Sequence, residues 1–159
     1  MRKSSQDTII RRFNILVDSR EQQPYLFPNS VIFALKCGDY SIEYNGVYYY
    51  NQIVIERKGD VSELFSATGS QRDRWERELE KLSLIPIRFV LCEFDYMDIV
   101  NDQPPGKLPA SAVYGSIAKW HSVYNVPFIF CGNKRNARNY LFKLFYFYVK
   151  HIILSDDDI

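Results

Sequence analysis

The sequence predicts an α/β protein in which helices cover both faces of a mixed central sheet. Three observations lead to this prediction. An antiparallel hairpin signal lies in the first half of the chain, β-rich runs alternate with helical patterns in the second half, and 159 residues that are 47% hydrophobic suffice for one buried core. Strands separated by helices need crossover connections, which give a partly parallel sheet inside an α/β/α sandwich. We expect a single domain over residues 1–159.

The first two strands are predicted from runs rich in β-branched and aromatic residues. FNILVD, residues 13–18, is such a run and ends on Asp18. VIFALKCGDYSI, residues 31–42, is a second candidate strand, bent at Gly38, because a glycine inside a strand often marks a bend. An aspartate therefore lies at the end of the first strand and another, Asp39, beside the bend in the second.

A hairpin follows, because Asn45-Gly46 is a two-residue turn signal. Residues 40–44 and 47–56 should therefore pair antiparallel, and the second arm leads into the charged run IERK. After this run the apolar pattern changes its period. Residues 59–70 fit a short helix or turn followed by a loop.

Residues 71–84 are predicted to form an amphipathic helix. Trp75, Leu79 and Leu82 recur at spacings of four and three and share one stripe between charged residues. The remaining predicted elements are a strand over 87–94, a helix near 110–124, a strand over 126–132 and a helix from 133 to about 153.

The last of these helices is apolar on two sides. One stripe consists of Leu141, Leu144, Phe145, Tyr148 and Ile152, and the other of Phe142, Tyr146, Val149 and Ile153. A helix that is hydrophobic nearly all round should be buried nearly all round, which a terminal helix on a small sandwich does not achieve alone. We therefore predict a homodimer through this helix. The alternative is an exposed side made mostly of tyrosine rings that water tolerates.

The charge distribution restricts the possible partners. A net charge of +1 and a pI near 7.7 give no uniform positive field, so any affinity for nucleic acid must come from local patches. Residues 1–12 form a basic arm, and residues 132–155 contain five basic residues and no acid. Residues 93–102 and the tail over 155–159 are acidic.

Cysteine and histidine usage argues against two other classes. The three cysteines have no paired spacing and only two histidines occur, so neither a disulfide framework nor a zinc centre is suggested. The start of the chain lacks the apolar core of a signal peptide, and charged residues interrupt the most hydrophobic stretch. We expect that the protein does not contact a membrane. We also expect it to be intracellular, in the cytoplasm or nucleus, or in a host cell if the source is viral.

Acidic residues near strand ends suggest a metal site. Asp18, Asp39 and Glu56 can meet at one edge of the sheet, where like-charged carboxylates would repel without a cation. Mg²⁺ or Mn²⁺ prefers a few carboxylate oxygens, suits phosphate substrates and can activate a water. Since side chains alternate along a strand, Lys58 projects beside Glu56 while Arg57 points away, so an ammonium lies where it can position that water.

Each of these groups also has a plainer interpretation. A single aspartate at a strand end is usually a turn or helix cap, and the tripeptide ERK is common on surfaces. The combination of VDSRE, GDY and IERK, in this order and each attached to a β-rich run, favours the metal site.

Taken together, VDSRE (17–21), CGDY (37–40) and IERK (55–58) resemble the signature of the XPF-type structure-specific nucleases. The core of that family is a restriction-endonuclease-like α/β/α sandwich with a mixed central sheet, of the PD-(D/E)XK superfamily. The resemblance covers roughly residues 13–135, and SQRDRWERELEKL is most similar to short stand-alone versions from phages and other viruses.

The resemblance implies roles for individual residues. Asp18, Asp39 and Glu56 would serve the metal, Mg²⁺ or Mn²⁺, and Lys58 would be the catalytic lysine. Arg20, Glu21 and Arg57 would support the site. The implied activity is metal-dependent hydrolysis of DNA phosphodiester bonds at branches, flaps or junctions in replication, recombination or repair.

Two features depart from the family pattern. An aspartate usually lies four residues after the lysine, whereas this position is Ser62 here, with Asp60 and Glu63 close by. Either acid could replace it, or the contact could be lost. The tandem helix-hairpin-helix module and the helicase part are missing as well, so substrate choice would come from this domain or a partner.

Further residues are candidates for contact with DNA. Arg72 and Arg74 begin the amphipathic helix, although i to i+4 ion pairs with Glu76 and Glu78 are an equal alternative. Lys134, Arg135 and Arg138 share one side of the last helix and could bind backbone phosphates, or simply be solvated. The run of Tyr48, Tyr49 and Tyr50 could stack on exposed bases, but more often such a run is ordinary strand.

Three functions remain open at this point. The first is a structure-specific endonuclease that acts on branched or junction-containing DNA. The second is a Holliday-junction resolvase-like or sequence-reading nuclease on the same scaffold. The third is a catalytically silent DNA-binding partner subunit, against which the presence of all three motif acids and the lysine argues.

Overall fold

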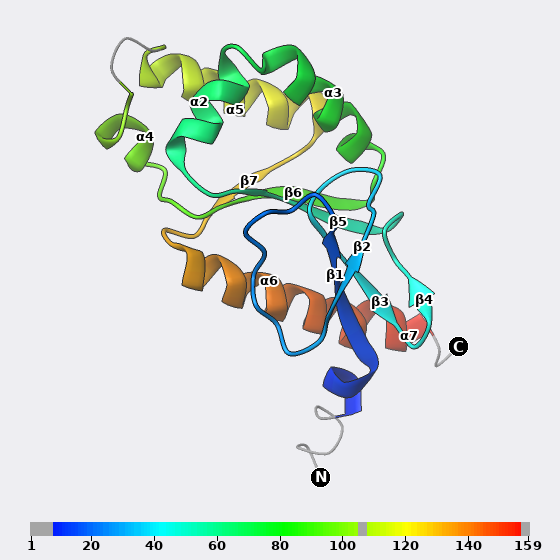
Figure 1. Cartoon of the computed structure of the whole chain (residues 1–159). Coiled ribbons are helices and arrows are strands. Elements are labelled where there is room, and N and C mark those ends of the chain that lie inside the picture. The colour runs from blue at the N-terminus through cyan, green and yellow to red at the C-terminus, as the bar shows by residue number, and fades with distance from the viewer. Residues whose placement is uncertain (1–7, 105–107, 157–159) are drawn as a thin grey trace.

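The computed structural model describes residues 8–104 and 108–156. Within these residues the centre of the molecule is one mixed sheet of seven strands (Figure 1). The strands are β1 (Phe13–Asp18), β2 (Ser30–Phe33), β3 (Tyr40–Tyr44), β4 (Val47–Tyr48), β5 (Ile53–Lys58), β6 (Ile87–Cys92) and β7 (Phe128–Phe130). They lie in the order β2-β1-β3-β5-β6-β7, and the short β4 pairs with β3.

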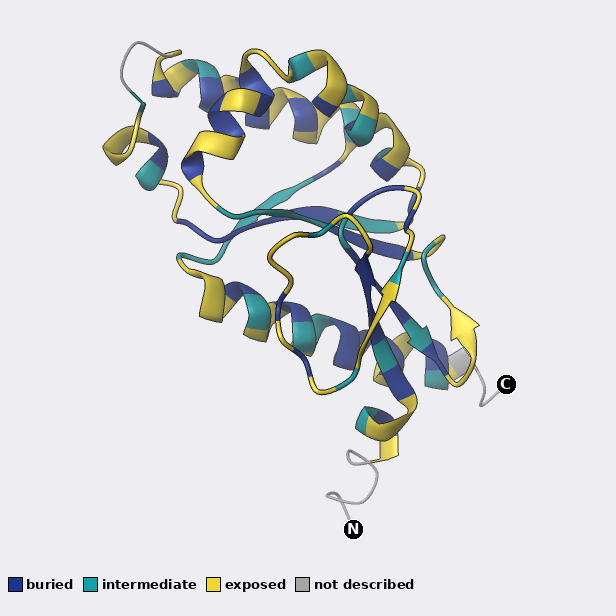
Figure 2. Cartoon of the chain, viewed as in Figure 1, coloured by how far each residue is buried: buried dark blue, intermediate teal, exposed yellow. Residues whose placement is uncertain are grey.

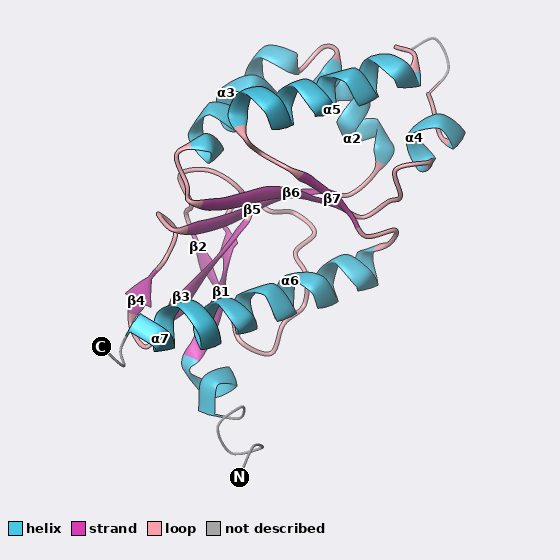
Figure 3. Cartoon of the chain, turned by 180° about the vertical axis from the view of Figure 1, so that it is seen from behind, coloured by secondary structure: helices cyan, strands magenta, loops and turns pink. Residues whose placement is uncertain are grey.

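Helices cover both faces of this sheet. On one face lie α2 (Val61–Thr68), α3 (Arg72–Ser83), α5 (Ala110–Tyr124) and the short α4 (Asp98–Asn101). On the other face α6 (Lys134–Tyr148) crosses the sheet, and the chain continues into the π-helical turn η1 (Val149–Ile153) and α7 (Leu154–Asp156) (Figure 3). The predicted α/β/α sandwich with a mixed sheet is therefore confirmed.

The predicted strand over residues 31–42 is wrong, because it is two strands. β2 pairs parallel with one side of β1, and β3 pairs antiparallel with the other side. No single strand can lie on both sides of β1, so residues 34–39 cross from one edge to the other. Gly38 makes this crossing possible, with φ of +71° and no room for a side chain, since a Cβ there would lie 2.1 Å from Cγ1 of Val54.

The predicted hairpin is present but shorter than expected. Asn45 and Gly46 both have positive φ, 51° and 85°, as the two-residue turn requires. The second arm is not continuous over 47–56, because a turn separates β4 from β5: the backbone N–H groups of Gln52 and Ile53 both donate to the carbonyl of Tyr49. β5 then rejoins β3 through the pair Tyr40 and Ile55.

The segment after β5 is a helix rather than a turn. α2 begins after Asp60, whose side chain accepts a hydrogen bond from the backbone N–H of Glu63 and so caps the helix. The amphipathic helix predicted over 71–84 is α3, and it buries Trp75, Leu79 and Leu82 as the periodicity indicates. The strand predicted over 126–132 is reduced to β7.

Two apolar cores lie on the two faces of the sheet. The core under α6 joins strands β1, β3 and β5 to residues such as Leu141 and Phe145, and Ile9 from the helical residues 8–12 also packs there. The core under α2, α3 and α5 draws its strand residues from β5, β6 and β7. On that face the described helices leave the β1–β4 half of the sheet uncovered, and β2 and β4 are exposed (Figure 2).

None of the described helices combines the length and the apolar character needed to cross a membrane.

Candidate active site

A cleft of about 980 Å³ opens where α2 and α3 approach the ends of β1 and β5 and the start of β3. The ionisable side chains that line it are the acids Asp18, Glu21, Asp39, Glu56, Asp60, Glu63, Glu78 and Glu93, and the bases Arg20, Arg57, Lys58, Arg74 and Lys134. Eight acids against five bases give the cleft an excess of negative charge. Such a surface attracts cations and repels a phosphate that arrives without one.

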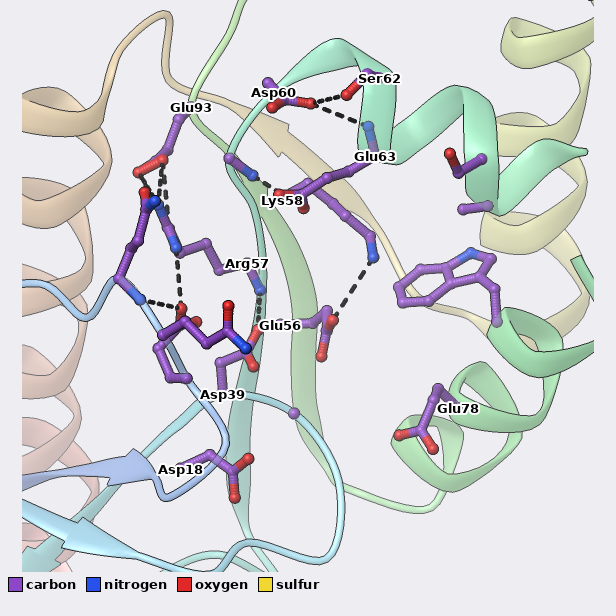
Figure 4. Close-up of a pocket in the computed structure, with 18 of the residues that line it drawn as sticks. Asp18, Asp39, Glu56, Arg57, Lys58, Asp60, Ser62, Glu63, Glu78 and Glu93 are labelled. Carbon is purple, nitrogen blue, oxygen red and sulfur yellow. Dashed lines mark hydrogen bonds and ion pairs between the residues drawn. The ribbon is translucent and has the colours of Figure 1, made fainter. Parts of the chain in front are cut away.

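The sheet brings the three predicted acids to this cleft (Figure 4). β1 ends on Asp18 where the antiparallel β3 begins after Asp39, and the backbone N–H of Asp18 donates to the Asp39 carbonyl over 2.8 Å. The backbone N–H of Asp39 donates to the carbonyl of Ile55 over 2.9 Å, which places Asp39 opposite Glu56 on β5. Main-chain hydrogen bonds therefore fix the relative positions of the acids.

Asp39 is held by the backbone of the neighbouring strand. Its Oδ2 accepts a hydrogen bond of 2.7 Å from the backbone N–H of Arg57. Burial raises the pKa of the Asp39 carboxyl well above its ordinary value, and the nearby charge of Glu56 raises it further. Two carboxyl groups that oppose each other's ionisation are stabilised when a cation comes to lie between them.

Glu56 and Lys58 project from the same face of β5, as the alternation of side chains predicts. Burial raises the pKa of Glu56 to about 6, while the charge of Lys58 opposes this rise. The Nζ atom of Lys58 lies 3.7 Å from Oε1 of Glu56 and 4.1 Å from the centre of the Trp75 ring. Trp75 is buried, so its ring is a fixed support over which the ammonium is held.

Arg57 points to the other side and enters a buried ion-pair network. Its Nε and Nη2 atoms donate to both carboxylate oxygens of Glu93 over 2.9–3.2 Å, and Nη1 donates to Glu21 over 3.1 Å. The guanidinium also lies 5.2 Å from the centre of the Tyr25 ring. Residues 56–58 thus send two side chains into the open cleft and one into its wall.

Two residues of this arrangement were missed by sequence reasoning, Trp75 and Glu93. Trp75 was assigned only to the apolar stripe of its helix, and nothing in the sequence indicates which strand residue lies over its ring. Glu93 carried a signal, because it follows the apolar run of β6 as Glu56 follows the apolar start of β5. Lys58 and Cys92 are register partners, so the parallel pairing of β5 and β6 brings Glu93 to Arg57.

Asp18 does not join the other two acids as expected. Its Oδ1 accepts a hydrogen bond from the backbone N–H of Leu35 over 2.9 Å, and its Oδ2 accepts one from Nε of Arg20 over 2.8 Å. The side chain is only 3% exposed. Across residues 8–104 and 108–156, no three His, Cys, Asp or Glu side chains lie close enough to share a metal ion. Asp18 therefore anchors the loop that follows β2, while the charge of Glu56 acts on Asp39 across the neighbouring strand.

The Ser62 position belongs to the start of α2. The Ser62 hydroxyl donates to Oδ1 of Asp60 over 2.6 Å, and this hydrogen bond lowers the pKa of the Asp60 carboxyl. Glu63 accepts a hydrogen bond from the backbone N–H of Gly59 over 3.2 Å. Both acids line the cleft, but each is already engaged by the backbone at the beginning of the helix.

The two arginines predicted at the start of α3 have different surroundings. Arg74 is exposed and lines the cleft. Arg72 does not line it, since its guanidinium pairs with Glu76 over 3.2 Å, donates to the Ser116 hydroxyl over 3.1 Å and lies over the Trp120 ring. The alternative of an i to i+4 ion pair is thus present for Arg72, whereas none joins Arg74 to Glu78 in the described part of the chain.

The three basic residues predicted on the last helix also differ. Lys134 is exposed and lines the cleft, and Arg135 is exposed beside it in the first turn of α6. Arg138 is half-buried, donates to the carbonyl of Leu26 over 2.7 Å and lies over the Phe27 ring. Only Lys134 of these three borders the acidic cleft.

The residues present fit a hard divalent cation and do not fit zinc. Mg²⁺ is usually bound by one or two carboxylates and keeps several waters, and Asp39 with Glu56 supplies such a pair. Neither Oδ1 of Asp39 nor Oε2 of Glu56 takes part in a hydrogen bond between described residues, so each has an oxygen available. A tetrahedral zinc site would need His or Cys ligands, which do not line the cleft.

No protein-family model matches the chain, and no curated protein matches it in sequence. Two solved structures are similar in fold. One is XPF from Aeropyrum pernix, with a TM-score of 0.64 and 16% identity over 84% of this chain, and the other is XPF from Aeropyrum pernix in complex with DNA, with a TM-score of 0.67 and 18% identity over 87% of this chain. The matched part spans 60% and 66% of those chains. The chain thus has the fold of an XPF-type nuclease domain.

Proposed function

We propose that the chain is a divalent-metal-dependent DNA endonuclease that cleaves phosphodiester bonds at branched, flap or junction structures. The observation that carries this proposal is the pair Asp39 and Glu56, with Lys58 beside Glu56, in an acidic cleft of an XPF-type fold. That one of the similar structures is a complex with DNA supports DNA as the substrate. The protein would then act where a cell keeps its DNA, in cytoplasm or nucleus, or in a host cell if the source is viral.

Asp39 and Glu56 would hold Mg²⁺ or Mn²⁺, which supplies an acidified water and a positive charge beside the scissile phosphate when bound. Lys58 acts from the same face. Its ammonium, fixed by Glu56 and the Trp75 ring, hydrogen-bonds the attacking water or a phosphate oxygen and offsets the negative charge that develops there. The geometry of these groups matters because small displacements of reacting atoms cost large factors in rate.

The remaining predicted site residues position these groups. Arg57 donates its backbone N–H to Asp39, and its side chain is fixed between Glu93 and Glu21. Asp18 and Arg20 form an ion pair that holds the loop between β2 and β3, on which Asp39 lies. None of them touches substrate in this proposal.

The DNA backbone would enter along the basic rim of the cleft. Arg74 and Lys134 border it from α3 and α6, and Arg135 follows Lys134. We assign these three residues to phosphate contacts. Arg138 and Arg72 should make only weaker contacts with phosphates, because other groups of the protein already bind their guanidinium groups. Binding that depends on such contacts weakens as the salt concentration rises.

A catalytically silent DNA-binding subunit is the second candidate. The departure at Ser62 and the engagement of Asp60 and Glu63 by α2 favour it, because they leave two carboxylates rather than three for the metal. The presence of Lys58 in a supported position favours the nuclease.

The test uses labelled forks, flaps, four-way junctions and plain duplex, each incubated with the chain and with Mg²⁺, Mn²⁺ or EDTA. Cleavage should require the metal. In Asp39→Asn and Glu56→Gln the cleavage rate should fall by a factor of about a hundred or more, as expected when charge stabilisation in the transition state is lost. The control is Glu80→Gln on the exposed side of α3, which should cut normally. Tight binding of the wild-type chain without any cutting would overturn the nuclease and support the silent subunit.

We also propose that the chain forms a homodimer through the C-terminal helix. Tyr140, Phe147 and Ile152 are 40%, 50% and 47% exposed on α6 and η1, and with Leu144 they line an apolar depression of about 460 Å³. An exposed apolar patch on the outer side of a helix that already buries its inner side is typical of a protein interface.

A further inference from the structure

The half of the sheet that has no helix on the side of α2, α3 and α5 carries a cluster of stacked aromatic rings. Phe33 on β2 stacks against Tyr48 on β4, with ring centres 5.2 Å apart and planes inclined by 27°. It also stacks against Tyr50, at 5.6 Å and 26°. We call Phe33, Tyr48 and Tyr50 the aromatic platform. Tyr48 is 48% exposed, and the other two rings are half-buried.

The aromatic platform lies on the same side of the sheet as the acids of the cleft. Phe33 and Asp18 are register partners on parallel strands, so their side chains project from one face. Tyr48 is the partner of Glu43, and Glu43 is the partner of Asn14, which shares its face with Asp18 by the alternation along β1. The hydrogen bond of 2.8 Å between the Asn14 and Glu43 side chains agrees with this assignment.

The platform adjoins the cleft directly. β2 lies beside β1, about 4.8 Å away as in any sheet, and the backbone N–H of Ser19 donates to the carbonyl of Phe33 over 3.1 Å. Leu35, two residues after Phe33, donates its backbone N–H to the carboxylate of Asp18, which lines the cleft. A nucleic acid strand that leaves the cleft past Asp18 therefore meets Phe33 next.

The chemistry of this surface suits bases better than phosphates. Residues 44–52 contain no charged residue, the register partner of Tyr48 is the acid Glu43, and the exposed β2 side chain on the same face as Phe33, Val31, is apolar. A duplex presents mainly its phosphates, which require cations. Unpaired bases present flat faces, and such faces stack on tyrosine and phenylalanine without regard to sequence. Arg20, which is 69% exposed, lines the cleft and pairs with Asp18, and the exposed Lys36 follows Phe33 by three residues.

The third tyrosine of the run confirms which rings belong to the surface. Tyr49 is directed toward the opposite core, where its ring meets Tyr148 edge to face at 6.2 Å. Only Tyr48 and Tyr50 are therefore available from the run of three, and Phe33 completes the platform from a strand that sequence reasoning did not connect with it.

We propose that the aromatic platform binds unpaired bases of a single-stranded DNA segment that adjoins the duplex held at the cleft. This inference rests on the proposed function, and it names the feature of a branched substrate that the chain recognises: the single strand at the junction, beside β2.

The test measures binding in EDTA, so that cleavage plays no part. The DNAs are a labelled duplex with a single-stranded overhang, the same duplex without the overhang, and the same overhang built from abasic nucleotides that keep every phosphate. The wild-type chain should bind the normal overhang about five-fold or more tighter than the abasic one, the factor expected for one stacked base. Tyr48→Ala should remove this preference, and Tyr48→Phe, which keeps the ring, should retain it.

Tyr96→Ala is the matched control, because Tyr96 is also 48% exposed and also stacks on a neighbour, Tyr114, but does not belong to the platform. It should bind all three DNAs like the wild-type chain. Phe33→Ala removes a half-buried ring of the platform and should also abolish the preference. If that variant unfolds, Tyr48→Ala, which changes an exposed ring, is the deciding variant. If the wild-type chain binds the normal and the abasic overhang with equal affinity, the proposed base-binding platform is wrong, whether or not cleavage is observed.

Two further outcomes separate the alternatives. If cleavage fails but the preference for bases persists, the nuclease is wrong and the platform stands. If Tyr48→Ala instead changes the oligomeric state of the protein in solution and leaves DNA binding intact, the exposed edge at β2 is a protein interface, and the proposed base-binding platform is wrong.

Discussion

At the scale of single residues, Arg57 forms the centre of a network of buried ion pairs in the site. Its side chain is 10% exposed, and that of its partner Glu93 is 4% exposed. Two charges removed from water in this way are tolerated only as a pair with good hydrogen bonds. The bidentate contact with Glu93 and the additional contact with Glu21 meet that condition.

Removal of the Arg57 side chain should therefore destabilise the protein. Arg57→Ala leaves Glu93 buried without its partner, and the free energy of unfolding should fall by about 3–5 kcal/mol. Urea unfolding, followed by circular dichroism, measures this change. The control is Lys81→Ala, which breaks an exposed ion pair with Glu78 and should cost no more than about 1 kcal/mol. Equal losses in the two variants would show that the Arg57 network contributes no more than a surface pair.

A second prediction at this scale compares two glycines with positive φ. Gly38→Ala brings strain of about 1–2 kcal/mol from φ of +71° and a clash with Val54 that adds about 1–3 kcal/mol. Gly46→Ala has the same kind of strain, with φ of +85°, but open space around the new methyl group. The same urea experiment should show Gly38→Ala as clearly the less stable variant. Equal stabilities would mean that Val54 moves aside freely.

At the scale of elements, the start of α2 decides the role of Asp60. If Asp60 serves only as the helix cap, Asp60→Ala should lower the free energy of unfolding by about 1 kcal/mol, and Asp60→Asn, an equally good cap, should lower it hardly at all. Both variants should cut DNA at close to the wild-type rate. Loss of cutting in a stable Asp60→Asn protein would show instead that this carboxylate replaces the aspartate that the family has at the Ser62 position.

The elements differ in how far the sequence determines them. The stripe of Trp75, Leu79 and Leu82 is a local pattern, and α3 follows it. The turn at Asn45-Gly46 is likewise local, and the structure confirms it. The division of residues 31–42 into two strands depends on β1 lying between them, which no window of the sequence contains. Local patterns thus predict elements, whereas the position of an element in the sheet depends on pairings between distant segments.

The same distinction applies to the candidate site. Asp39, Glu56 and Lys58 could be named from motifs, because each motif is short and attached to an apolar run. Arg57 and Glu93 are 36 positions apart, and their pairing depends on the parallel packing of β6 against β5. Lys58 and Trp75 are 17 positions apart, and their contact depends on the placement of α3. The role of Asp18 also depended on such a contact, with Leu35.

At the scale of the whole molecule, the proposed dimer can be tested by one substitution. Phe147→Glu places a charge among the residues that line the apolar depression, and a dimer formed through it should dissociate to a monomer of 18.8 kDa. Sedimentation velocity measures the mass. The control is Val123→Glu, at a 62% exposed position on α5, on the opposite side of the sheet. A wild-type chain that is already monomeric at high concentration would contradict the dimer.

The order of the groups along the chain has a consequence for biosynthesis. The acids and the amine of the proposed chemistry all precede residue 59, while Trp75, Glu93 and Lys134, which support or border them, come later. When a nascent polypeptide has emerged from the ribosome only as far as α2, it carries every reactive group. It does not yet contain the ring of Trp75, which supports Lys58, or Glu93, the partner of Arg57. The cleft can therefore reach its working geometry only after β6 has been translated and has added itself to β5.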